Sequence, residues 1–215
     1  MTVSDPTLDV ETELITSGAP FVIGCDEVGR GAVAGPVAVG MAVVDATHTS
    51  IPPGLRDSKM LSEKKRTSLA PVVATWALHS AVGLASPQEV DDVGIVTALG
   101  LAAKRALGLL YEQGLAIASG TILLDGNHDY LSPTLTHPLD VRTRVKGDRD
   151  CASIAAASVV AKVHRDTMMV AEHAKTPVYE WQSNKGYGSV AHLEAIRAHG
   201  VTSVHRRTWL VNHVG

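Results

Sequence analysis

The sequence has few aromatic residues and few cysteines. Its 215 residues include one Phe, three Trp and four Tyr, so the core must be aliphatic and an aromatic side chain outside it needs an explanation. Cys25 and Cys151 are too few for a disulfide framework, and the ten histidines show no zinc spacing. The longest apolar run, near 155–163, contains Lys162 and cannot span a bilayer, so no membrane association is expected.

Positive charge is also scarce overall. The formal net charge is −3, so no global field draws the protein to nucleic acid. The charge is unevenly distributed, however. Between Arg142 and Arg165 six cations stand against two anions, whereas the first eighteen residues hold four acids and no Lys or Arg. A local excess of this kind is compatible with a partner rich in phosphate.

The composition is that of one globular domain. Apolar residues make up 45% and charged residues 19%, and 215 residues can bury a sizeable core. We expect residues 1–18 to form a loose acidic arm and residues 19–215 to form a single domain. No signal peptide is expected, because the N-terminus is acidic and its first apolar run is short. The expected state is a cytoplasmic monomer.

Short apolar runs alternate with segments of helical periodicity. Ser62 is suited to cap a helix, and Pro71 should shorten or kink that helix. Strands that come first and helices that come later, with some interleaving, predict an α/β fold with a mixed central sheet flanked by helices and a helical C-terminal part. The predicted strands are 21–25, 36–44, 77–85, 122–124 and 139–145, and the predicted helices are 61–74, 94–111, 153–172 and 192–199.

Asp26 and Glu27 follow the first predicted strand. Successive residues of a strand point to opposite faces, so both carboxylates can serve one site only if the strand ends between them. Gly29 and Gly31 permit such an end, because glycine allows a close approach of a ligand to the backbone. Carboxylate oxygens suit Mg²⁺ or Mn²⁺. For the pair alone, however, an exposed acidic turn is the more common explanation.

Asp125 makes a metal site more credible. It follows the buried strand 122–124, and two neighbouring strand ends would bring three carboxylates to one point. Asp148 could supply a fourth carboxylate, and by spacing alone Asp150 is an equal rival. Either of these two could instead compensate the charge of a helix N-terminus. Four oxygen donors without Cys or His indicate two-metal phosphoryl chemistry.

Several motifs, in order along the chain, point to one family. The segment 24–31, GCDEVGRG, resembles the signature of the type 2 ribonucleases H, in particular the bacterial ribonuclease HII family. The resemblance runs from about residue 20 to residue 210. Val28 stands where the family often has a small residue, and Thr208-Trp209 stand where it often has Ser-Phe. The other matching motifs are 57–62 (DSKMLS), 125–127 (DGN), 146–148 (KGD), 153–158 (SIAAAS), 161–166 (AKVHRD), 185–188 (KGYG) and 205–209 (HRRTW).

The resemblance implies a ribonuclease H-like fold and assigns the site. Metal-binding and catalytic roles fall to four carboxylates, which would hold Mn²⁺ or Mg²⁺: Asp26, Glu27, Asp125 and Asp148. The choice of Asp148 over Asp150 comes from the family motif. The backbone of Gly29, Arg30 and Gly31 would contact the ribose 2′-OH, which distinguishes RNA from DNA, and Tyr187 would lie against the sugar at the RNA–DNA junction. Expected phosphate contacts, for which an intramolecular salt bridge is an equal alternative, are Lys59, Lys146, Lys162, Arg165, Arg206 and Arg207.

The function implied by the resemblance is endonucleolytic. The enzyme would hydrolyse the RNA strand of RNA–DNA hybrids and cut 5′ to a single ribonucleotide in duplex DNA, which starts ribonucleotide excision repair. One alternative is the type 3 ribonuclease H, which carries an extra N-terminal substrate-binding domain. About twenty residues before Phe21 are too few for that domain, and the turn of Tyr187 fits type 2 better. A second alternative, a hybrid-binding module without activity, would need a missing carboxylate.

Overall fold

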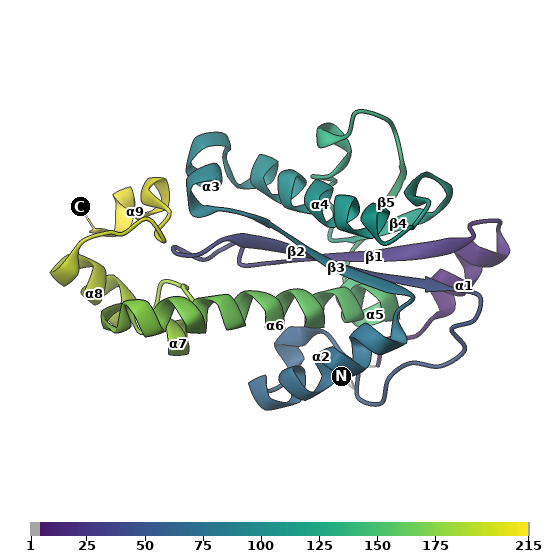
Figure 1. Ribbon diagram of the computed structural model, residues 1–215, viewed down its shortest axis with the longest axis horizontal. Coiled ribbons are helices and arrows are strands. Elements are labelled where there is room, and N and C mark those ends of the chain that lie inside the picture. The colour runs from purple at the N-terminus through teal and green to yellow at the C-terminus, as the bar shows by residue number, and fades with distance from the viewer. Residues whose placement is uncertain (1–4, 215) are drawn as a thin grey trace.

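The computed structural model describes residues 5–214, with side chains placed up to residue 211. Residues 1–4, the start of the predicted arm, and residue 215 lie outside the described part. A central sheet lies between two helical layers, and the C-terminal helices extend beyond one end of it (Figure 1). The prediction of a mixed α/β architecture is confirmed.

The sheet of the described chain has the strand order β3-β2-β1-β4-β5. β1 pairs antiparallel with β2 and parallel with β4. The last residue pair between β1 and β4 is Cys25 and Leu124. The pairing of β1 with β2 continues three residues further, to Val28 and Ala38. The end of β1 is therefore open on the side of β4. The strands are β1 (Phe21–Val28), β2 (Val37–Asp45), β3 (His79–Ala85), β4 (Thr121–Asp125) and β5 (Asp140–Arg144).

Helix α4 (Ile95–Glu112) covers one face of the sheet and α6 (Ala152–Lys175) covers the other (Figure 1). Two strand glycines allow α6 to approach closely. A Cβ atom at Gly24 would lie 2.1 Å from the carbonyl carbon of Ser153, and one at Gly40 would lie 2.4 Å from the carbonyl oxygen of Ala157. The small residues of α6 thus pack directly on the backbone of β1 and β2.

The largest core cluster lies between the sheet and α4 and is mainly aliphatic. Aromatic packing is concentrated in the C-terminal part, where the rings of Tyr179 and Trp181 stack with centroids 4.9 Å apart. Trp181 donates a hydrogen bond to His192, which lies beside His205. The C-terminal helices therefore have a core of their own.

Of the remaining helices, those at Glu63–Trp76 and Val190–His199 correspond to the predicted helices 61–74 and 192–199, whereas the four others were not predicted. α2 begins after Ser62, whose hydroxyl accepts from the N–H of Lys65, and it continues past Pro71 to Trp76. The predicted shortening of this helix at Pro71 is therefore wrong. These helices are α2 (Glu63–Trp76), α3 (Pro87–Val93), α5 (Gly147–Asp150), α7 (Trp181–Asn184), α8 (Val190–His199) and α9 (Arg207–Val214), with 3₁₀ turns at Ser58–Met60, Ile117–Ser119, Ser132–Thr134 and Pro177–Tyr179.

The prediction of a loose arm is wrong for α1 (Asp9–Thr16). Glu11 is only 1% exposed, and its carboxylate accepts hydrogen bonds from the backbone N–H (2.8 Å) and the hydroxyl (2.7 Å) of Ser153. The apolar side chains of Leu8 and Leu14 pack beside β1. This arm is thus part of the packed fold. Among the described residues, no helix combines the length and the apolar character needed to cross a membrane.

Candidate active site

The acidic pair Asp26 and Glu27 lies inside β1, which runs to Val28. The prediction that the strand ends between the two carboxylates is therefore wrong. By strand alternation Asp26 shares the α6 face with Gly24, and Glu27 shares the opposite face with Cys25. The pairing of β1 with β4 stops at Cys25, so the two carboxylates lie just beyond the last paired residue, with Asp26 buried and Glu27 partly exposed. The feature that sets them apart is an open strand edge rather than a strand terminus.

Asp125 and Asp148 lie next to this open edge. Asp125 is the last residue of β4, and its Oδ1 accepts a hydrogen bond of 3.1 Å from the backbone N–H of Asp148. Lys146 adopts a left-handed conformation (φ 59°) before α5 and turns the chain toward β4. The carboxylate of Asp150 instead pairs with Arg144 at 3.5 Å on the surface. Spacing alone left Asp148 and Asp150 equal; the geometry favours Asp148.

The carboxylates of this group raise each other's proton affinity. Burial, followed by the charges of Glu27 and Asp125, holds the pKa of Asp26 well above its usual value. Burial and then Asp148 raise the pKa of Asp125. Asp26 is only 1% exposed, and its Oδ2 has no hydrogen-bond partner among the described residues. The positive charge beside these carboxylates comes from Arg30, whose Nη1 lies 3.5 Å from Oε1 of Glu27, and from Lys59.

Lys59 supplies part of that charge. Its Nζ lies 3.4 Å from Oδ2 of Asp148. Burial lowers the pKa of Lys59, but the carboxylates of Asp26, Asp57 and Asp148 outweigh this effect, so that the pKa is raised. Lys59 and Arg30 are both flexible and exposed, and they cannot balance a cluster of carboxylates, because exposed ion pairs contribute little in water.

A divalent cation fits the donors that are present. Within residues 5–214 no group of three or more His, Cys, Asp or Glu side chains is arranged closely enough to form a ready metal site. The donor set nevertheless has the chemistry that Mg²⁺ and Mn²⁺ prefer, namely carboxylate oxygens from several elements. The unpartnered buried Oδ2 of Asp26 is a vacant acceptor of the kind a cation would satisfy.

Asp57 is a fifth carboxylate of this region, to which the sequence analysis assigned no role. It is buried, and it accepts a 2.9 Å hydrogen bond from the N–H of Lys59. Burial raises its pKa, with Asp148 adding to the effect. The neighbouring Ser58 is bonded to Ser158 of α6. The DSK motif was the available signal, but the contact of Asp57 with Asp148 depends on the fold.

The loop that follows β1 (residues 29–36, called the glycine loop) lies against the turn that contains Tyr187 (residues 185–188). The carbonyl oxygen of Gly186 accepts from the N–H groups of Val33 (2.9 Å) and Ala34 (3.0 Å), which docks the turn onto the loop. Tyr187 is 37% exposed and does not fill a core. The Cζ atom of Arg165 lies 5.4 Å from the centroid of its ring. The structure therefore joins the turn of Tyr187 to the loop at Val33 and Ala34, and the roles expected for Gly29, Arg30, Gly31 and Tyr187 stay predictions.

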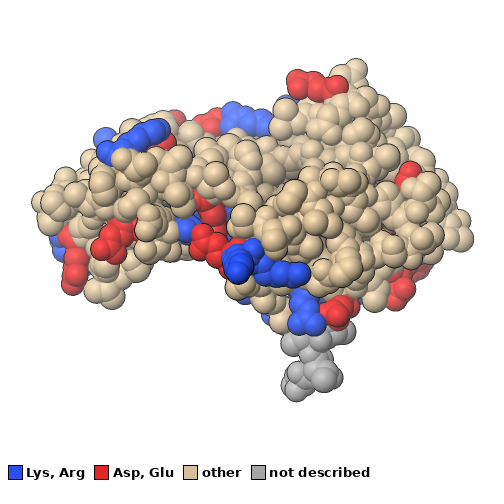
Figure 2. All heavy atoms as spheres, turned by 60° about the horizontal axis from the view of Figure 1, so that its bottom comes forward, with Lys and Arg blue, Asp and Glu red and all other residues tan. Residues whose placement is uncertain are grey.

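The predicted phosphate contacts divide into exposed and buried residues. Lys59, Lys146 and Arg207 are exposed. Arg165 and Arg206 are 0% exposed and donate to backbone carbonyls, so the prediction that they contact phosphate is corrected. Acidic and basic side chains lie next to each other in the middle of the face that Figure 2 shows, and much of that face is uncharged.

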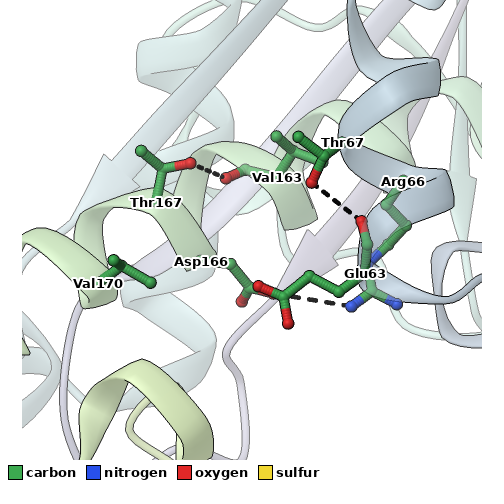
Figure 3. Close-up of a pocket in the computed structure, with 7 residues that line it drawn as sticks. All are labelled: Glu63, Arg66, Thr67, Val163, Asp166, Thr167 and Val170. Carbon is green, nitrogen blue, oxygen red and sulfur yellow. Dashed lines mark hydrogen bonds and ion pairs between the residues drawn. The ribbon is translucent and has the colours of Figure 1, made fainter.

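Lys162 is already paired within a network between α2 and α6. Its Nζ donates to Asp166 at 2.7 Å, and Arg66 lies 3.9 Å from the same carboxylate. Between these helices lies a cavity of about 130 Å³, and Asp166 and Arg66 are among the residues that line it (Figure 3). Glu63, at the start of α2, binds Nζ of Lys185 at 3.1 Å. This second ion pair connects α2 to the turn of Tyr187, and Nζ of Lys162, besides its pair with Asp166, lies 5.6 Å from the centroid of the Tyr187 ring.

The two cysteines, Cys25 and Cys151, are not reactive thiols. Both are free and buried. Burial raises the pKa of the Cys25 thiol, and burial with Glu11 raises that of Cys151 to about 12. Thiols with raised pKa values are poor nucleophiles at neutral pH.

Comparison with known proteins agrees with this geometry. The family model described as Ribonuclease HII matches residues 23–212. The chain is 46% identical to a Ribonuclease HII of Streptomyces griseus over 208 residues, which cover 95% of this chain and 84% of that protein. It is similar to the ribonuclease H2 structure from Pyrococcus horikoshii, with a TM-score of 0.67, 26% identity, and coverage of 88% of this chain and 93% of that chain. A structure of Bst-RNase HIII in complex with Mn²⁺ shares the fold, with a TM-score of 0.68, 23% identity, and coverage of 95% and 68%. The predicted ribonuclease H-like fold is confirmed.

Proposed function

The chain belongs to the ribonuclease HII family and is a ribonuclease H endonuclease for RNA–DNA hybrids, and from this premise we propose that it also cuts duplex DNA 5′ to a single embedded ribonucleotide. The observation that carries the proposal is the docking of the Tyr187 turn onto the glycine loop, beside the carboxylates. A loop that reads one ribose and a ring that packs on the next sugar need only one ribonucleotide. Such a cut would begin ribonucleotide excision repair.

We propose that the metal-binding and catalytic residues are Asp26, Glu27, Asp125 and Asp148. Members of this family depend on divalent metal ions, and Mn²⁺ or Mg²⁺ suits these oxygen donors. When bound, a pair of such ions would activate the attacking water and stabilise the leaving oxygen. The protein contributes the placement: the N–H of Asp148 orients Asp125, and the buried position of Asp26 excludes water from one side. The raised pKa values of Asp26 and Asp125 reflect burial first and then repulsion between the carboxylates, and a cation would relieve the repulsion.

The exposed cations have a separate role in the proposal. Lys59, Lys146 and Arg207 would contact phosphates on either side of the scissile bond, which positions the strand without reading its sequence. Their contribution should weaken as the salt concentration rises, because it depends on the release of counterions. Lys162 would act on the substrate only through its pair with Asp166. A cytoplasmic monomer remains the expected state of the enzyme.

Cleavage of three substrates tests the proposal: a uniform RNA–DNA hybrid, duplex DNA with one ribonucleotide, and duplex DNA without any, each with and without Mn²⁺ or Mg²⁺. We expect metal-dependent cutting of the first two, with 3′-OH and 5′-phosphate products at the 5′ side of the ribonucleotide. Cutting of the hybrid alone would refute the single-ribonucleotide activity and would favour a type 3-like enzyme. Binding without any cutting would contradict the assignment of the carboxylates.

A further inference from the structure

Two arginines lie fully buried beneath the glycine loop without a carboxylate partner. Arg165 of α6 and Arg206, just before α9, are each 0% exposed, and neither forms an ion pair among residues 5–214. Burying a guanidinium costs free energy unless its donors are satisfied. Backbone carbonyls satisfy both groups here. Because the burial of two guanidinium groups costs free energy, stability alone does not explain their position.

The six hydrogen bonds converge on two short segments. Arg206 donates from Nη2 to the carbonyl of Gly29 (2.7 Å), from Nη1 to that of Arg30 (3.0 Å) and from Nε to that of Gly35 (3.1 Å). Arg165 donates to the carbonyls of three residues, at distances of 2.8–2.9 Å. These residues are Ala34, Pro36 and Lys185.

Arg206 therefore sets the direction of the loop's free donors. In a trans peptide the C=O of one residue and the N–H of the next point in opposite directions. Because the carbonyls of Gly29 and Arg30 turn inward to Arg206, the N–H groups of Arg30 and Gly31 turn outward. Neither N–H has a hydrogen-bond partner within the described part of the chain. Space is open at Gly31, where an added Cβ would meet nothing within 4 Å.

Arg165 connects this loop to Tyr187. Its guanidinium bonds Ala34 of the loop and Lys185 of the turn at the same time, and it lies 5.4 Å from the ring of Tyr187. The fit is close, since a Cβ at Gly29 would lie 2.1 Å from Nε of Arg165. A lysine could not replace it, because one nitrogen cannot span both segments.

We propose that these two arginines are positioning residues that adapt the site to a single ribonucleotide. Arg206 aims the N–H groups of Arg30 and Gly31 at the ribose. Arg165 holds Tyr187 at a fixed distance from these donors. The inference rests on the proposed cutting at single ribonucleotides. A uniform hybrid offers a 2′-OH at every position and tolerates a misplaced ring, whereas a single ribonucleotide has one productive register. Burial and the charge of Arg165 lower the pKa of Arg206 to about 9, so Arg206 stays charged at neutral pH.

The test compares kcat/KM on the two substrates for Arg165→Lys and Arg206→Lys. We expect each variant to lose roughly 100-fold at the single ribonucleotide and roughly tenfold or less on the uniform hybrid. The matched control is Arg105→Lys, which alters an arginine bound to Glu89 and to the carbonyl of Leu84, away from the site. Arg105→Lys should leave kcat/KM unchanged on both substrates. Equal losses on both substrates would overturn the inference and leave a purely structural role. A wild-type enzyme that cuts only hybrids would instead refute the proposed function.

A double-mutant cycle keeps the inference testable if a variant is unstable. If Arg165 acts through Tyr187, then Arg165→Lys should not change the substrate ratio further once Tyr187→Ala is present. Additive effects on the ratio would refute the connection. Gly29→Ala is a further variant, because its methyl group would displace Arg165 without removing a charge and would also strain the loop, where Gly29 has a φ of 83°. It should lower the same ratio, and an unchanged ratio would contradict the proposal. Thermal melting of each variant confirms that the assay temperature lies below its transition.

Discussion

If Asp148 is a metal ligand, replacing it with Asn should raise the stability of the metal-free protein and abolish its activity. Asp148→Asn removes one negative charge beside Asp125, whose pKa is raised by burial and then by Asp148 itself. It also removes the contact with Lys59, which is largely exposed and worth little. We therefore expect the metal-free variant to be more stable than the wild type and to have lost cleavage. Asp150→Asn should break only a surface pair with Arg144.

The magnitudes follow from these environments. Relief of one like-charge contact near the surface is worth on the order of 1 kcal/mol, which raises the Tm of a protein of this size by about 2–4 °C. Mn²⁺ at a hundred times its Kd would stabilise the wild type by about 2.7 kcal/mol, or roughly 5–11 °C. The Asp148→Asn variant should lose most of this metal-induced increase and at least about a hundredfold in kcat. For Asp150→Asn the change in stability should stay within about 0.5 kcal/mol.

Two assays on the same preparations check this prediction. Thermal melting with chelator and with increasing Mn²⁺ measures the charge relief and the metal-induced stabilisation, and cleavage of a labelled hybrid measures activity. Gel-shift binding in chelator should remain close to that of the wild type for both variants. Loss of activity and of metal stabilisation in Asp150→Asn, with both retained in Asp148→Asn, would refute the reasoning.

The other predictions concern single residues. Burial raises the pKa of Glu11 in the folded state, so the charge of Glu11 lowers the stability of the fold above that pKa. This loss of stability disappears as the pH falls toward the unfolded value of 4.5. Glu11→Gln should therefore have a higher Tm than the wild type at pH 7 and no such gain near pH 4.5 in melting curves. Burial and His192 lower the pKa of His205 from 6.5 to about 4, so stability should fall between these pH values by on the order of 2 kcal/mol, and His205→Gln should reduce the fall in urea unfolding. Tyr187→Ala should lose at least about tenfold more kcat/KM at a single ribonucleotide than on a uniform hybrid, as a ring contact of about 1.4 kcal/mol would give; equal losses would argue against junction recognition. Gly24→Ala should destabilise by about 1–3 kcal/mol in urea unfolding, because its methyl group would overlap the backbone of α6.

Much of the fold could be predicted from local sequence. The positions of the strands and of the four longest helices (α2, α4, α6 and α8) followed from hydrophobic periodicity, and Ser62 marked the start of α2, because periodicity and capping depend on neighbouring residues. Asp125 was found for the same reason, since an aspartate that ends a buried strand is a local signal. The ordered motifs identified the family, and the comparisons confirm it.

Tertiary structure decided the features that join distant segments. Glu11 belongs to a packed helix because Ser153, 142 residues away, satisfies its carboxylate. Asp26 and Glu27 share an open edge because β4 stops pairing at Cys25, although β1 itself continues.

The basic residues show the same division. Composition and spacing marked Arg165 and Arg206 as cations, which are expected on a surface that binds phosphate. The fold instead places both beneath the glycine loop, where carbonyls from residues 29–36 and from Lys185 surround them. The sequence by itself determines which side chains are cations and which are carboxylates, and therefore which groups can bind phosphate or a metal ion. Burial depends on which distant segments pack together, and therefore only the tertiary structure decided which cations face the substrate and which hold the loop.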